Sequence, residues 1–390
     1  MGYLAKEERD RRLEAVRAIL AAKDLDLALV YYDEFNIGNG WYLTGWCPQF
    51  ESGCVLVPRA GEPMILGGPE SEPFAKQDSA ITETRNLPCF MVPDEEYPNA
   101  VIGSWPKLFA EISAGRKIRR AGIVGAQRMP AGIRAQIGEA FAGVELVDIT
   151  GDYEALRAIK SEWEREMIRK AFQITDGAIA AMKAAVKPGV REIEVAAEGE
   201  YAARKAGASG FGFTAIVGSG PRSNAVVPTA SSRVIQRGES VMLGIAPKWF
   251  GYAGVAGATV FAGQATEKQR AFLRNLSKTF ALTKAMLLPG KKGKEVDAPG
   301  RKFYDELGWT KYIVCPFAHT IGLHEAEGPF FGPHSSDELK PGMTVCIDVS
   351  FFGHPEFFGA RIETGYEITA SGPKPLSPAM DKYLCEEIGR

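Results

Sequence analysis

The sequence has only four histidines and six cysteines in 390 residues, and its charges nearly cancel. The 46 basic and 48 acidic residues leave a formal net charge of -2, which gives no general attraction to nucleic acid or anionic lipid. No apolar run reaches the ~18 residues of a membrane-spanning helix, and residues 1–9 are charged, without the apolar centre of a signal peptide. We therefore expect a soluble, cytoplasmic protein that binds neither nucleic acid nor membrane.

The cysteines are scattered through hydrophobic segments, with no CxxC pair and no cysteine-histidine pair at metal-binding spacing. This arrangement favours reduced, buried thiols over disulfides or a zinc site. The six positions are Cys47, Cys54, Cys89, Cys315, Cys346 and Cys385.

Two parts of the chain show different patterns, and 390 residues with 45% apolar content are enough for two domains. In residues 1–151, short apolar runs typical of strands alternate with helical patterns, which indicates an α/β domain. Residues 154–186 have the apolar spacing of one or two long helices, and Pro188-Gly189 ends this run. Strand-like segments and a helix at about 267–288 follow. Residues 152–390 are therefore expected to form a second domain of mixed helices and strands.

Seven short motifs stand in a recognisable order. They are RAIKSEWE (157–164), KPGVREIE (187–194), IVGSG (216–220), GESVML (238–243), FGY (250–252), LKPGM (339–343) and RIE (361–363). In order and spacing they resemble the pita-bread superfamily of methionine aminopeptidase, Xaa-Pro aminopeptidase, prolidase and creatinase. Residues 36–45 resemble the extra domain of the prolidase and creatinase branches. The resemblance implies an α/β N-terminal domain followed by an α+β pita-bread catalytic domain.

Only part of the superfamily's metal-ligand set is present. In the peptidase members, two Asp, one His and two Glu hold two divalent ions that share a hydroxide nucleophile. The Asp positions are occupied here by Gly244 and Val255, which have no metal-binding side chain. By the resemblance, the His corresponds to His319, the first Glu to Asp348 and the second to Glu363. Losing both Asp removes a bridging carboxylate and much negative charge, so the sequence predicts no two-ion site.

Three further positions of the peptidase pattern are changed. Two imidazoles that handle substrate in peptidases correspond to Val227 and Ala326, and an expected Arg corresponds to Ala258. None of these replacements can transfer a proton or carry a charge. The prolidase and aminopeptidase functions are therefore not implied by the fold alone.

The remaining residues favour the creatinase branch, which works without metal and binds a guanidinium between carboxylates. We expect a metal-independent hydrolase, needing no cofactor, that cleaves a C–N bond of a small polar substrate of amide or guanidinium type. His319 is expected to act as general acid or base, with Glu327 orienting its imidazole, while Asp348 and Glu363 hold the positive end of the substrate. The expected substrate-contacting residues are His324, Tyr252, Arg361 and Trp249.

Two alternatives remain open. One divalent ion held by His319, Asp348 and Glu363 would give a Xaa-Pro peptidase-like hydrolase. A pita-bread protein that has lost catalysis would instead be a binding protein. In either case the resemblance implies a homodimer in which one N-terminal domain closes over the partner's site.

Overall fold

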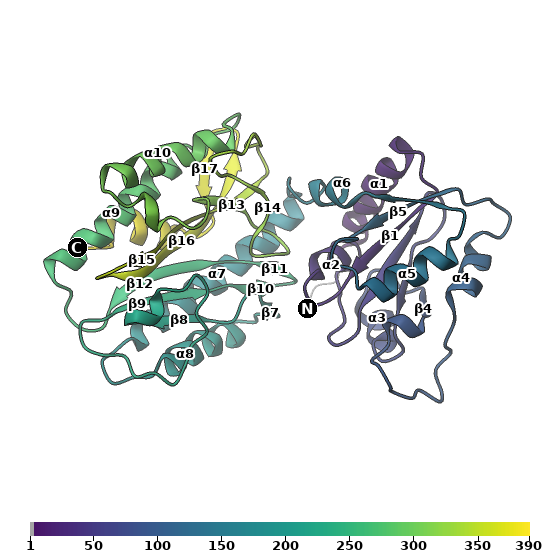
Figure 1. Cartoon of the computed structure of the whole chain (residues 1–390), viewed down its shortest axis with the longest axis horizontal. Helices are drawn as coiled ribbons and strands as arrows, with labels where there is room; N and C mark the ends of the chain where they lie inside the picture. Colours follow the sequence, from purple (N-terminus) through teal and green to yellow (C-terminus); the bar gives the residue numbers. More distant parts are fainter. Residues whose placement is uncertain (1–3) are drawn as a thin grey trace. The chain divides into compact units, whose positions relative to one another are not determined.

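The computed structural model describes residues 4–390. The chain forms two compact units that divide between Arg157 and Ala158 (Figure 1). None of the helices in the described part of the chain has an apolar stretch long enough for a bilayer span. Each unit has its own sheet and core, and the expected α/β and α+β architectures are confirmed.

Unit 1 is built on a mixed six-stranded sheet with the order β4-β3-β2-β1-β5-β6. The central strands β1 and β2 are buried along their whole length, because helices pack on both faces of this sheet. That burial explains why their sequences, LALVYY and GCVLVP, are continuous apolar runs without alternation. The strands are β1 (Leu27–Tyr32), β2 (Gly53–Pro58), β3 (Met64–Gly67), β4 (Thr84–Asn86), β5 (Arg120–Val124) and β6 (Glu145–Asp148). The helices are α1 (Lys6–Ala22), α2 (Ile37–Thr44), α3 (Glu72–Asp78), α4 (Trp105–Ile112), α5 (Ala131–Ala140) and α6 (Thr150–Ala155).

Unit 2 has an eight-stranded antiparallel sheet. Seven of its strands follow the order β14-β13-β15-β16-β12-β9-β8, and the eighth, β17, pairs with β16. A second sheet contains β11, β10 and β7. The strands are β7 (Gly210–Phe211), β8 (Ile216–Ser219), β9 (Ser240–Ile245), β10 (Pro247–Trp249), β11 (Tyr252–Ala253), β12 (Ala256–Phe261), β13 (Ala318–Thr320), β14 (Glu327–Phe330), β15 (Thr344–His354), β16 (Phe358–Thr369) and β17 (Gly372–Pro375). The helices are α7 (Glu162–Ala185), α8 (Glu192–Lys205), α9 (Glu267–Lys284), α10 (Gly293–Glu306) and α11 (Pro378–Lys382).

The segment 154–186, expected to form one or two long helices, contains the end of α6 and the long helix α7. The short α6 ends at Ala155, and α7 begins at Glu162 because Ser161 caps its first turn. The Ser161 side chain accepts a hydrogen bond from the Glu164 backbone, and the Glu164 side chain accepts one from the Ser161 backbone. This capping box satisfies two backbone donors that a helix start otherwise leaves unpaired.

The helices of unit 2 pack against one face of the large sheet. Residues of α7, α8, α9 and α10 form a single apolar core with alternate residues of β15 and β16, including Ile347, Val349 and Ile362. Because successive side chains of a strand point to opposite faces, the intervening residues point away from this core. Four of those intervening residues, Asp348, Ser350, Arg361 and Glu363, are polar, and they build the candidate site.

Candidate metal centre

Four polar side chains share one face of the β15–β16 pair. Asp348 lies directly opposite Glu363, and Ser350 lies directly opposite Arg361. Residues two apart on a strand share a face, so the antiparallel register places the four side chains in a compact group. All four residues are buried.

His319 joins this group from β13. It pairs with Cys346 of β15, two residues before Asp348 and therefore on the same face. The imidazole Nδ1 lies 3.0 Å from the Thr320 carbonyl oxygen. A carbonyl can only accept, so Nδ1 carries a proton, and Nε2 faces the site, where it can bind a metal ion when the imidazole is neutral. This arrangement is typical of a metal-binding histidine, whose second ring nitrogen is fixed by a backbone carbonyl.

Two carboxylates face Nε2 of His319. The Glu363 Oε1 lies 3.7 Å away and the Glu325 Oε1 lies 3.8 Å away. One ligand atom from each of the three residues lies within 4.8 Å of the others, a spacing that suits binding of one metal ion. An imidazole with two carboxylates is a common donor set for a catalytic divalent ion that keeps open positions.

Glu363 is the most deeply buried acid of the group. Its side chain is 1% exposed, and neither carboxylate oxygen has a hydrogen-bond partner among residues 4–390. Leaving a carboxylate in this state is costly unless a cation compensates it. Burial, together with the nearby Glu325 charge, raises the Glu363 pKa above its usual value. Nε2 of His319 at 3.7 Å and Nε of Arg361 at 3.9 Å are the nearest cationic groups, and a divalent ion between Glu363 and His319 would compensate the carboxylate more closely.

The charge of the two acids also affects His319. Burial lowers the His319 pKa, but Glu363 and Glu325 outweigh this effect and raise it to about 9. In the absence of a bound ion, the imidazole is therefore itself the cation that the two carboxylates attract.

Glu325 was not identified in the sequence analysis. It lies in the loop between β13 and β14, and its side chain is 16% exposed. The family pattern drew attention to the neighbouring Ala326, where an imidazole was expected. Two acids flank that position, and this was the only available signal, because strand alternation does not predict the direction of a loop side chain.

Asp348 is held in a separate ion pair. Its Oδ2 lies 3.2 Å from Nη2 of Arg361, and its Oδ1 accepts a hydrogen bond of 2.6 Å from the Ser350 hydroxyl. Nε of Arg361 donates to the Ser350 hydroxyl oxygen at 3.3 Å. Burial raises the Asp348 pKa, and the Arg361 charge opposes that rise. Of the residues expected at the site, the structure thus brings together His319, Asp348, Glu363 and Arg361.

Glu327 and Tyr252, which were also expected at the site, make contacts with residues outside the His319, Asp348, Glu363 and Arg361 group. Nζ of Lys160 donates to Oε1 of Glu327 at 2.7 Å, and both side chains are buried. The Tyr252 hydroxyl donates to Oε1 of Glu164 at 2.9 Å, which links β11 to the first turn of α7. Glu327 and Tyr252 are both bound to charged partners of unit 2.

Trp249 and His324 are both half-buried. Trp249 packs against the backbone at Gly207 and against the apolar core of unit 2. His324 lies in the turn after β13, where its carbonyl accepts a hydrogen bond from the Gly322 backbone.

Comparisons with known proteins identify the family. Residues 166–370 match Metallopeptidase family M24, and residues 12–159 match the Creatinase/Prolidase N-terminal domain. The chain belongs to metallopeptidase family M24. This membership confirms the pita-bread superfamily and places the protein in a family of hydrolases that act on C–N bonds.

Relatives of this M24 protein include several named peptidases. It is 32% identical over 249 residues to an uncharacterized peptidase of Bacillus subtilis, covering 64% of this chain and 70% of that protein. It is 28% identical over 340 residues to the Xaa-Pro dipeptidase of Pyrococcus horikoshii, covering 87% of this chain and 90% of the relative. The solved prolidase of P. horikoshii has the same fold, with a TM-score of 0.80, 24% identity and coverage of 94% and 98% of the two chains.

The expectation of a metal-free site was wrong. The chain matches a metallopeptidase family, and the structure assembles His319, Glu325 and Glu363 as a possible metal-binding group. The error arose because ligands were counted only at the family's motif positions. A donor from a position outside the motif, Glu325, restores a three-residue set.

Proposed function

We propose that this M24 protein is a hydrolase that uses one divalent metal ion to cleave the C–N bond of a short peptide. The ion would be held by His319, Glu325 and Glu363. The observation that carries the proposal is the buried Glu363 carboxylate, which has no hydrogen-bond partner among residues 4–390 and lies 3.7 Å from Nε2 of His319. An Xaa-Pro peptide is the proposed substrate, because a relative that covers 87% of this chain is an Xaa-Pro dipeptidase.

The bound ion would supply Lewis-acid polarisation of a carbonyl and a water that loses its proton near neutral pH. His319 holds Nε2 in place through the hydrogen bond of Nδ1 to Thr320. The Glu363 side chain is only 1% exposed, so water screens its negative charge little and its attraction to a cation is strong. His319 and Glu363 would therefore determine where the ion binds and where the substrate is cleaved.

Proton transfer is assigned to Glu325. Its side chain is 16% exposed, whereas that of Glu363 is 1% exposed, so Glu325 is the acid of the donor set that reaches solvent. One of its oxygens can face the ion while the other accepts a proton from water and returns it to the leaving nitrogen. Val227 and Ala326 offer no imidazole for this task.

The experiment begins with protein stripped of metal by a chelator and dialysed. Hydrolysis is then measured on Xaa-Pro dipeptides, longer Xaa-Pro peptides and peptides lacking proline, before and after addition of Mn²⁺, Co²⁺ or Zn²⁺. We expect activity only with metal, its loss in Glu325→Gln, and its retention in Glu306→Gln, a matched change at an exposed acid of α10. Absence of turnover on the whole panel with every ion would refute the proposal.

A non-catalytic binding protein is the second candidate. It is favoured by the loss of both substrate-handling imidazoles at Val227 and Ala326 and of two metal ligands at Gly244 and Val255. Saturable binding of an Xaa-Pro dipeptide without its hydrolysis, in protein loaded with metal, would support this candidate over the enzyme.

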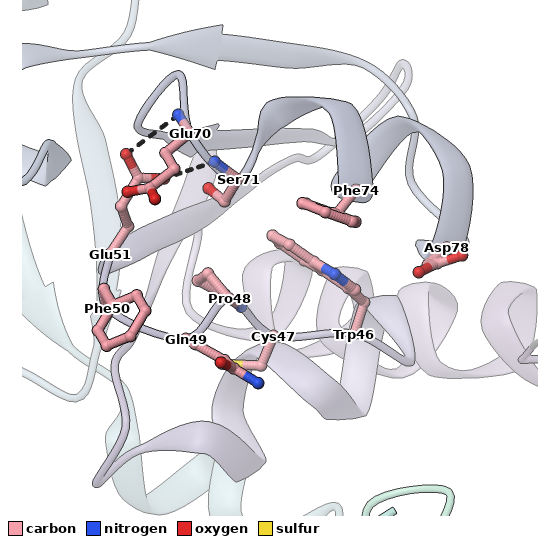
Figure 2. Close-up of a pocket in the computed structure, with 10 residues that line it drawn as sticks. All are labelled: Trp46, Cys47, Pro48, Gln49, Phe50, Glu51, Glu70, Ser71, Phe74 and Asp78. Carbon is pink, nitrogen blue, oxygen red and sulfur yellow. Dashed lines mark hydrogen bonds between the residues drawn. The ribbon is translucent and has the colours of Figure 1, made fainter.

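We also propose that the protein is a homodimer and that unit 1 carries part of the contact surface. Unit 1 has a cavity of ≈ 330 Å³ lined by Trp46, Phe50, Glu51 and Phe74 among others (Figure 2). Phe50 is 79% exposed and Phe74 60% exposed, which is unusual for side chains of this size. A second copy of the chain is the occupant that the family resemblance favours. Light scattering should give a dimer mass, and the double change Phe50→Ser with Phe74→Ser should shift it toward the monomer.

A further inference from the structure

We infer that Arg361 is a built-in cation that stands where a second metal ion would need to bind, so that the centre takes one divalent ion only. The inference rests on the proposed one-ion function. It concerns the part of the centre formed by Asp348 and Arg361.

The position of the guanidinium is the first observation. Nη2 of Arg361 lies 3.2 Å from Oδ2 of Asp348, and Nε lies 3.9 Å from Oε2 of Glu363. The guanidinium thus lies within ion-pair distance of both acids that correspond to the family's two Glu ligands. Because all three side chains are buried, bulk water does not screen these interactions.

The space for Arg361 is created by a glycine on the neighbouring strand. Gly257 of β12 lies directly opposite Glu363 of β16. A Cβ atom at Gly257 would lie 2.8 Å from Cγ of Arg361 and 2.9 Å from Cβ of Glu363. Any larger residue would therefore push the Arg361 side chain away from its present path. The Arg-Ile-Glu motif is shared with the superfamily, but here it is accompanied by this open position and by the loss of both Asp ligands.

Few donor atoms remain for a second ion. Both Asp348 oxygens are engaged, one by the Ser350 hydroxyl and the other by Arg361. The two positions where the family has Asp ligands are Gly244 and Val255, and both are buried without an oxygen in the side chain. A second divalent ion would have to displace the guanidinium and then find most of its ligands in water.

The balance of charge also favours one ion. The centre contains three carboxylates, those of Glu325, Asp348 and Glu363, and one guanidinium, that of Arg361. One divalent ion with a neutral His319 makes this group electrically neutral. A second divalent ion would leave two uncompensated positive charges in a buried pocket, which is strongly unfavourable. A guanidinium stays protonated throughout the accessible pH range, so this cation cannot be removed by titration.

The test measures how many ions bind. Metal-stripped protein is titrated with Mn²⁺ by calorimetry, and the metal retained after dialysis against a fixed free Mn²⁺ concentration is measured by elemental analysis. Wild type is expected to bind one equivalent per chain. The double change Gly244→Asp with Arg361→Ala restores one family donor on the strand beside Gly257, frees Asp348 and brings the group to four negative charges, so it is expected to bind two. Arg361→Lys keeps the positive charge and is the matched control, with one equivalent expected.

A second measurement needs no variant and decides the matter if the double variant fails to fold. Wild type with excess Mn²⁺ is examined by electron paramagnetic resonance, where an isolated ion gives a six-line signal and two neighbouring ions give a spin-coupled signal. The six-line signal is expected. Two equivalents or a spin-coupled signal in wild type would overturn this inference while leaving a metal-dependent hydrolase intact. The same conclusion would follow if the double variant Gly244→Asp with Arg361→Ala folds and binds one equivalent. No binding in any of these proteins would overturn the proposed metal centre itself.

Discussion

Glu363 should lower the stability of the metal-free protein, and its replacement by glutamine tests this directly. The carboxylate is 1% exposed and has no hydrogen-bond partner among residues 4–390. An unsatisfied buried polar group typically costs about 1–3 kcal/mol, and a charged one costs more. Removing the charge strands no partner, because Arg361 keeps its contact of 3.2 Å with Asp348 and His319 can release its proton. The glutamine amide keeps the cost of a neutral unsatisfied group, so only the excess due to the charge is removed, and metal-free Glu363→Gln should unfold with a free energy on the order of 1 kcal/mol above that of wild type.

The order of stability should reverse when metal is added. A ligand that binds only the folded state stabilises it by about 2.7 kcal/mol at 100 times its dissociation constant. Wild type should gain this amount with Mn²⁺, whereas Glu363→Gln has lost a ligand and should gain little. Wild type should thus be less stable than Glu363→Gln without the ion and more stable than it with the ion. The reason is that the Glu363 carboxylate is an uncompensated buried charge in the first case and a metal ligand in the second.

The assay is urea unfolding at neutral pH, once with chelator and once with saturating Mn²⁺, using the transition of the C-terminal unit. Glu306→Gln is the control, since this exposed change should leave both the stability and the response to metal as in wild type. The reasoning fails if metal-free Glu363→Gln is less stable than wild type by ~1 kcal/mol or more, which is about the net worth of one hydrogen bond. It also fails if the variant gains as much stability from Mn²⁺ as wild type does.

Three other changes test the framework around the centre. Lys160→Met removes the buried ammonium that lies 2.7 Å from Oε1 of Glu327, so we expect a loss of about 3–5 kcal/mol in urea unfolding, with partial recovery when Glu327→Leu is added. An unchanged midpoint in the single variant would contradict this. Ser161→Ala removes the capping side chain of α7 and should cost about 1 kcal/mol, whereas Ser161→Thr, which keeps a capping hydroxyl, should cost less. Burial lowers the Lys183 pKa from 10.5 to about 8, so between these values the unfolded chain binds more protons than the folded one, and the free energy of unfolding should rise with pH. Lys183→Met should remove this rise, and identical pH profiles for the two proteins between pH 8 and 10.5 would show that Lys183 is not the cause.

Parts of the fold were predictable because their signals are local. The runs that became β1 and β2 are apolar at every position, as expected for strands covered on both faces. The order of the seven motifs was sufficient to predict the α/β N-terminal domain and the pita-bread C-terminal domain. The sequence analysis allowed one or two helices over 154–186 but did not place the start of α7 at Ser161, although the capping pair Ser161 and Glu164 is visible in the sequence three residues apart.

The centre was only partly predictable, because its geometry depends on pairings that are distant in sequence. Asp348 and Glu363 were identified by motif, and strand alternation is consistent with their shared face. The route of the Arg361 side chain depends on Gly257, a residue of another strand whose opposition to Glu363 follows from the sheet register. Such a relation involves more than 100 residues of intervening chain and has no local signature. The sequence therefore suggested which acids would meet, but not which of them would keep a free oxygen.

The pairing of Asp348 with Arg361 changes what the loss of two family ligands means. If the remaining acids were all available, their negative charge would favour recruitment of as many divalent ions as the donors could hold. Because Arg361 already compensates one carboxylate, the charge left by Glu325 and Glu363 matches a single divalent ion. The missing Asp residues and the position of the guanidinium are thus consistent with each other, since a second ion would lack both ligands and compensating charge. A centre of this composition can keep the Lewis-acid chemistry of the family with one ion, provided that Glu325 remains able to bind on one oxygen and exchange protons on the other.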